Sequence, residues 1–177
     1  MHRGWRSVSL AALVAAPAAC ATEYLSLEAA QRAAFPEATA FTPVLLSLDA
    51  DARARLASVA KPPGARDPKV WRAMAGPRVL GTFYLDAVIG KQELIGYALA
   101  LDPTGRVLRV DVLEYRETHG WEIRNEHWRG QFTGKTVADP VELNRDIANI
   151  SGATLSCRHV TDGVRRLLAL HALLPAA

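Results

Sequence analysis

Three strand-like segments follow one another between residues 78 and 115, and this order constrains the fold more than any other feature of the sequence. Residues 78–88 are rich in Val, Phe and Tyr, and residues 95–101 alternate large apolar side chains with Gly and Ala. An Asp-Pro-Thr-Gly turn separates the second segment from the third, at residues 107–115. Connections this short join antiparallel strands. We therefore expect an α+β domain with an antiparallel sheet meander and flanking helices.

The third strand-like segment has the two-residue period of a strand with one buried face. Leu108, Val110 and Val112 alternate with Arg109 and Asp111. The pattern predicts that the apolar side chains pack into the core and that the two charged side chains face solvent.

Two helical patterns precede these strands. Residues 22–35 predict a short helix capped by Ser26, and residues 47–60 predict a second helix. The second pattern ends before a Pro-Gly cluster at residues 61–64, which predicts a loop.

A third helical pattern ends the chain and is the most regular of all. Five residues recur at helical spacing, namely Val160, Val164, Leu167, Leu168 and His171, and Arg165 and Arg166 lie on the opposite side. The pattern predicts a C-terminal helix that begins at residues 151–156 and exposes both arginines. His127, His159 and His171 are expected to be ordinary surface or interface groups.

The N-terminus has the features of a secretory signal. Two arginines precede an apolar run at residues 8–19, and small residues follow it. We expect residues 1–21 to be a signal peptide and residues 22–177 to form one exported, periplasmic domain of the Gram-negative type, with a helical N-terminal portion. Ala19-Cys20-Ala21 fits ordinary signal peptidase, whereas Cys20 could instead carry a lipid anchor, although Pro17 stands where such sites usually have Leu.

Charge and cysteine content exclude several classes of function. The whole chain has a formal charge of +3, but residues 22–177 hold 19 basic and 18 acidic residues, so no nucleic-acid partner is expected. Cys157 and His159 alone cannot complete a tetrahedral metal shell, so no metal is expected. The sequence has neither a Rossmann glycine pattern nor a Walker loop, and it gives no sign of NAD or ATP binding.

Residues 151–156, Ser-Gly-Ala-Thr-Leu-Ser, lie where the C-terminal helix is expected to begin. Free N–H groups and the positive end of the helix dipole favour a phosphate there. Gly152 and Ala153 allow close approach to the backbone, and Thr154 offers a hydroxyl that could form a phosphoester. Ser151 or Thr154 could alternatively serve only as a helix N-cap.

This motif resembles the hallmark of the FMN-binding domain family, which occurs in the C subunit of sodium-translocating NADH:quinone reductase, in Rnf electron-transport complexes and in free-standing exported proteins. The resemblance implies that Thr154 carries FMN through a phosphodiester. It also implies a maturation partner, a separate Mg-dependent flavin transferase that takes the group from FAD.

Further segments carry the same resemblance, which covers roughly residues 30–175. Residues 117–121, Glu-Thr-His-Gly-Trp, resemble a Glu-Thr-Pro-Gly-Leu segment of the family, and residues 34–36 resemble its Phe-Pro start. Trp128, Gln131-Phe132 and Gly134-Lys135 match later family signals. One departure is Ala148, because the family often has Asp at that position; here the nearest acid upstream is Asp146.

The resemblance implies a covalent FMN site with no catalytic residue of its own. The residues expected to bind the cofactor are Thr154, Ser151, Gly152, Ala153, Leu155, Ser156, Glu117, Thr118, His119, Gly120, Trp121 and Lys135. The expected function is electron transfer between membrane or periplasmic redox proteins. Two alternatives remain: an exported adaptor without flavin, which Ala148 favours, and a small-molecule reductase with His119 as proton donor.

Overall fold

The computed structural model describes residues 22–23, 25–59 and 67–174. The predicted signal peptide, Cys20 and the predicted Pro-Gly loop lie outside the described residues. None of the helices in the described ranges combines the length and the apolar character that a bilayer crossing requires.

One antiparallel sheet forms the centre of the described structure, with the strand order β1-β6-β5-β4-β3-β2. The strands are β1 (Thr22–Glu23), β2 (Ala40–Val44), β3 (Lys69–Ala75), β4 (Arg78–Ile89), β5 (Leu94–Leu101) and β6 (Val107–Tyr115). Because β3 to β6 are neighbours both in sequence and in space, the predicted meander and the α+β class are confirmed.

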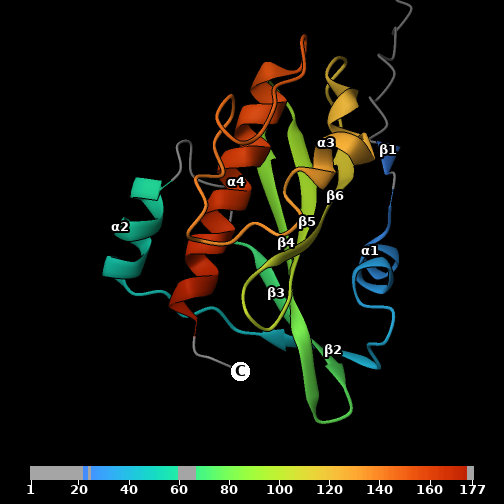
Figure 1. Ribbon diagram of the computed structural model, residues 1–177, viewed down its shortest axis with the longest axis vertical. Helices are drawn as coiled ribbons and strands as arrows, with labels where there is room; N and C mark the ends of the chain where they lie inside the picture. Colours follow the sequence, from blue (N-terminus) through green and yellow to red (C-terminus); the bar gives the residue numbers. More distant parts are fainter. Residues whose placement is uncertain (1–21, 24, 60–66, 175–177) are drawn as a thin grey trace, which may run out of the picture.

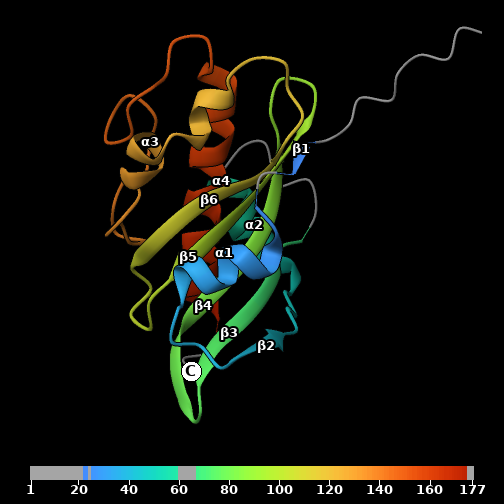
Figure 2. The same cartoon turned by 90° about the vertical axis from the view of Figure 1, so that its right-hand side faces the viewer.

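Helices cover both faces of this sheet (Figures 1 and 2). The helical elements are α1 (Leu27–Ala34), α2 (Ala50–Val59), the 3₁₀ helix η1 (Trp121–Arg124), α3 (Glu126–Gly130) and α4 (Thr154–Leu173). The long helix α4 lies along one face against β4 and β5, and α1 lies on the opposite face near β6. The predicted C-terminal helix is confirmed, and it begins within the motif at Thr154.

Two hydrophobic cores result from this arrangement. The larger core lies between the sheet and α4, where Tyr84 and Leu99 pack with Val164 and Leu167. The smaller core lies on the α1 face and contains Phe35, Phe83 and Leu113 among its members. Because both faces are covered, charged side chains on either face can become buried.

The predicted exposure of Asp111 and Arg166 is therefore wrong. Asp111 lies on the covered α1 face of β6 and is 4% exposed; its carboxylate accepts hydrogen bonds from Arg109 and Arg129. Arg166 is 8% exposed and donates to the buried carboxylate of Asp86 at 2.5 Å. A buried charge is tolerated when it is paired and hydrogen-bonded, and residue type alone does not reveal such a partner.

The N-terminal prediction is partly wrong. Thr22 and Glu23 form a strand that pairs with β6, and the helix begins only at Leu27, after the predicted cap Ser26 accepts a hydrogen bond from the Ala29 N–H at 3.2 Å. The second predicted helix begins at Ala50, because Asp49 Oδ1 caps it. His171 is also not an ordinary surface group, since its half-buried ring bonds to the Tyr84 hydroxyl at 2.7 Å.

Candidate functional site

A cleft of about 380 Å³ lies at the N-terminal end of α4. Its lining comes from the β4–β5 turn, the segment after β6 and the start of α4: Lys91, Gln92, Glu117, Thr118, His119, Gly152, Ala153, Thr154, Leu155 and Ser156. The volume lies within the range of small-molecule sites. Two segments that the sequence singled out separately thus line one cleft.

The first turn of α4 presents donors to this cleft. The N–H groups of Thr154, Leu155 and Ser156 precede the first intrahelical bond, from Cys157 N–H to the Ala153 carbonyl at 2.9 Å, and they have no acceptor among the described residues. The turn has neither a side-chain cap nor an acidic residue. Free N–H groups and the dipole of a 20-residue helix favour an anion at this position.

The Thr154 hydroxyl lies at the same helix end and is partly exposed. Its Oγ accepts a hydrogen bond from Asn149 Nδ2 at 3.0 Å. Gly152, two residues before, has φ +84°, a left-handed conformation that glycine adopts without strain. A partly exposed hydroxyl therefore lies beside free helix N–H groups in an accessible cleft.

Both backbone polar groups of Ala148, just before the motif, are hydrogen-bonded to side chains. Trp128 Nε1 donates to the Ala148 carbonyl at 2.8 Å, and the Ala148 N–H donates to Gln131 Oε1 at 2.7 Å. Trp128 is buried. Two residues that carry the family resemblance thus fix the course of the chain just before residues 151–156.

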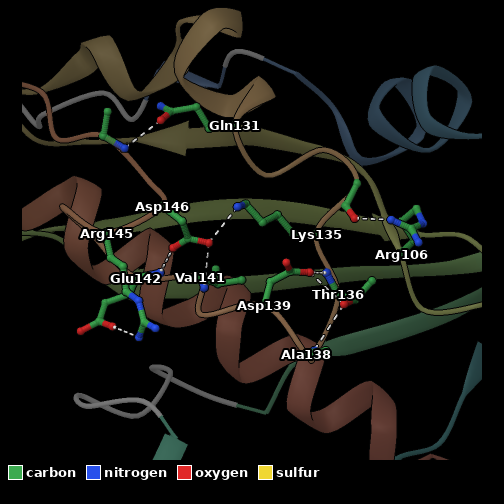
Figure 3. A network of polar contacts seen from close by, with 12 residues as sticks. Arg106, Gln131, Lys135, Thr136, Ala138, Asp139, Val141, Glu142, Arg145 and Asp146 are labelled. Carbon is green, nitrogen blue, oxygen red and sulfur yellow. Dashed lines mark hydrogen bonds and ion pairs between the residues drawn. The ribbon is translucent and has the colours of Figure 1, made fainter.

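Lys135 does not line the cleft. Its ammonium group donates to Asp146 Oδ2 at 2.8 Å within a network of the loop that precedes the motif (Figure 3). The Asp146 carboxylate also accepts N–H bonds from Val141 and Glu142. Partial burial alone would raise the pKa of Asp146, but Lys135 and these N–H groups outweigh it and lower that pKa. The structure thus gives Lys135 a contact that orders the loop.

Glu117 shapes the cleft through the β4–β5 turn. Its Oε1 accepts N–H bonds from Lys91, Gln92 and Glu93 at 2.5, 2.6 and 2.9 Å. Partial burial would raise the pKa of Glu117, but the three N–H groups and the Lys91 charge outweigh it and lower that pKa. Gly90 lies close to this carboxylate, and a Cβ there would be 2.7 Å from Oε1, so a larger residue would have to displace the Glu117 side chain.

Tyr115 connects the segment after β6 to the motif. Its hydroxyl donates to the His119 carbonyl and lies 3.1 Å from the buried Ser156 hydroxyl. Gly120 has φ +89°, and a Cβ there would lie 2.7 Å from the Tyr115 hydroxyl and 3.2 Å from Ala153 Cβ. Glycine at position 120 therefore lets this segment pack against the start of α4.

The structure places the remaining predicted site residues at or near the cleft. Ser151 and Trp121 are exposed neighbours of lining residues and do not line the cleft themselves. Trp121 is 56% exposed, and the Arg124 guanidinium lies 5.6 Å from its ring centroid. Sequence reasoning missed Tyr115 and Asn149; their signal was that each lies two residues before one of the two motif segments.

Fold and site together define an α+β domain in which the uncapped N-terminus of the long helix α4 faces a cleft. Residues 90–169 match the family model described as the FMN-binding domain. The matched range contains every residue that lines the cleft. Over these residues the chain is similar to the FMN-binding domain family, and the match supports FMN as the cofactor. No curated protein matches the chain.

Proposed function

We propose that this chain is an exported flavoprotein that carries FMN esterified to Thr154 and passes electrons between other proteins. The observation that carries the proposal is the position of Thr154. It is the first residue of α4, and it lines a cleft beside uncapped helix N–H groups. These groups fit a phosphate, and the hydroxyl fits a phosphoester bond to it.

The chain's own residues would bind and orient the cofactor. The N–H groups of Thr154, Leu155 and Ser156 would hold the phosphate, and His119 and Thr118 would offer polar contacts from the opposite wall of the cleft. When bound, the isoalloxazine supplies the redox chemistry. Leu155 is 43% exposed, which leaves an apolar side chain at the cleft for contact with the ring or with a partner.

Covalent attachment suits an exported protein. A cofactor that dissociated outside the cell would be diluted, whereas a tethered one stays at its binding site. Export rests on the predicted signal peptide at residues 1–21, with a possible lipid anchor at Cys20. The proposal includes a flavin transferase as maturation partner and membrane or periplasmic redox proteins as electron donor and acceptor.

Co-expression with a flavin transferase tests the proposal. Wild-type chain should retain flavin fluorescence on a denaturing gel, whereas Thr154→Ala should lose it. Thr133→Ala is the matched control, because this exposed hydroxyl has no side-chain bond among the described residues and does not line the cleft. Fluorescence that persists in Thr154→Ala would contradict the proposal.

Ala148 favours a second candidate, an exported binding module that keeps the fold without covalent flavin. Asp146 does not supply the acid that position 148 lacks, because its carboxylate is bound to Lys135 and to backbone N–H groups. This candidate predicts a wild-type chain that stays colourless with excess transferase. A reductase with His119 as proton donor predicts instead sustained turnover of a small substrate, lost in His119→Ala.

A further inference from the structure

We infer that the Asn149 carboxamide prepares the Thr154 hydroxyl for flavin transfer in this chain, where position 148 has no acid. The inference rests on the proposed function. It begins from the Asn149 Nδ2 to Thr154 Oγ hydrogen bond of 3.0 Å, the one side-chain contact of this hydroxyl among the described residues.

The surroundings fix Asn149 in this position. Trp128 and Gln131 hold both backbone polar groups of Ala148, the residue directly before Asn149. Downstream, the Ala153 N–H donates to the Ile150 carbonyl at 3.0 Å, so the turn between Asn149 and α4 is closed. Asn149 itself is exposed, and the contact with Thr154 therefore does not result from burial in a core.

The direction of this hydrogen bond determines its chemical effect. An amide nitrogen can only donate, so Thr154 Oγ is the acceptor and its own hydrogen stays available for transfer. A donor aimed at an oxygen stabilises the negative charge that develops there as the proton leaves. The positive end of the α4 dipole acts in the same sense on the first residue of the helix.

The step that Asn149 would assist balances as follows. A lone pair of Thr154 Oγ forms a bond to the phosphorus that bears the riboflavin half of FAD. The pyrophosphate bond to the AMP half breaks, and AMP leaves with that electron pair. The hydroxyl proton passes to a base supplied by the transferase, so no oxidant or reductant is needed.

Neither position 148 nor Asp146 supplies an acid for this role. The Ala148 methyl group has no polar atom, and the Asp146 carboxylate is bound within its own loop. Asn149 is therefore a polar donor where the family often uses an acid one residue earlier. The Asn149 amide donates a hydrogen bond, whereas a carboxylate can only accept one. Replacing Asn149 by Asp therefore distinguishes the two roles.

The test measures the initial rate at which purified transferase adds flavin to the chain, followed by intact mass at several pH values. We expect Asn149→Ala to load at least tenfold more slowly than wild type, because a donor to a charged oxygen is worth about 1.5 to 3 kcal/mol. Asn149→Asp should be equally slow, since a carboxylate cannot donate. Asn144→Gly is the control: it removes an exposed amide from the same loop at φ +66°.

The shape of the pH profile and the thermal midpoint separate this role from a structural one. The rising limb of the rate reports the base of the transferase, so Asn149→Ala should lower the rate by the same factor at every pH, with the limb and the thermal midpoint at their wild-type values. A decrease smaller than tenfold, a lowered thermal midpoint or fast loading of Asn149→Asp would overturn the role of Asn149 alone. Wild type that takes up no flavin would overturn the proposed function as well.

Discussion

Replacement of Glu117 is the sharpest test of how the cleft is built. Its carboxylate gathers three backbone N–H groups of the β4–β5 turn, at 2.5 to 2.9 Å, and two residues of that turn line the cleft. Glu117→Ala removes the acceptor of all three bonds. Because these bonds are accessible to solvent, water can replace part of each, and a net value of about 0.7 kcal/mol per bond is appropriate.

The expected loss for Glu117→Ala is therefore about 2 kcal/mol in the free energy of unfolding. In a domain of this size that corresponds to a fall in the thermal midpoint of roughly 4 to 8 °C. Glu117→Gln keeps an acceptor oxygen but loses the charge, and should cost about 1 kcal/mol. Urea titration followed by circular dichroism measures both values.

The difference in the free energy of unfolding between wild type and Glu117→Gln should depend on pH with a defined sign. Because the folded-state pKa of Glu117 is lowered below 4.5, the carboxylate contributes its full stability above that value. The contribution is lost as the pH falls from 4.5 through the folded-state pKa. The gap between wild type and Glu117→Gln should thus be constant from pH 7 to about 5.5 and shrink below pH 4.5. A gap that is absent at pH 7, or unchanged at pH 3.5, would refute the reasoning.

Three further changes test the packing around the site. Arg166→Met leaves the Asp86 carboxylate buried without its cation and should cost about 3 to 5 kcal/mol in urea titrations; a loss under 1 kcal/mol contradicts this. Gly120→Ala should cost about 2 kcal/mol or more and Gly152→Ala only about 1, since both have positive φ but only the first meets neighbouring atoms. Burial, with a smaller effect of a nearby arginine, lowers the pKa of His171, so stability should fall as the pH drops below 6.5, and His171→Gln should flatten this loss.

Local sequence patterns predicted the parts of the fold that local physics decides. The meander followed from alternating apolar residues and a tight turn, and α4 followed from helical spacing. Residues 69–75 mix charged, aromatic and small residues without clear alternation, and residues 40–44 contain Pro43. Residues 69–75 form a strand because β4 offers a partner, and residues 40–44 form one because β3 does, which is tertiary information.

Within the site, the motifs gave the location but not every role. Residues 117–119 and 152–156 meet at one cleft, as separate resemblances to one family imply. Lys135 resembled a cofactor contact, yet an ion pair with Asp146 holds it in a loop. Tyr115 and Asn149 act through partners that are 41 and 5 positions away, and no spacing rule reveals such side-chain contacts.

Peptide mass spectrometry of the chain isolated from cells with an active flavin transferase tests the central claim most directly. The peptide that contains residues 151–156 should gain the mass of one FMN less one water, with fragment ions that assign the gain to Thr154. The same peptide unmodified, or a gain assigned to any other residue, would contradict the account.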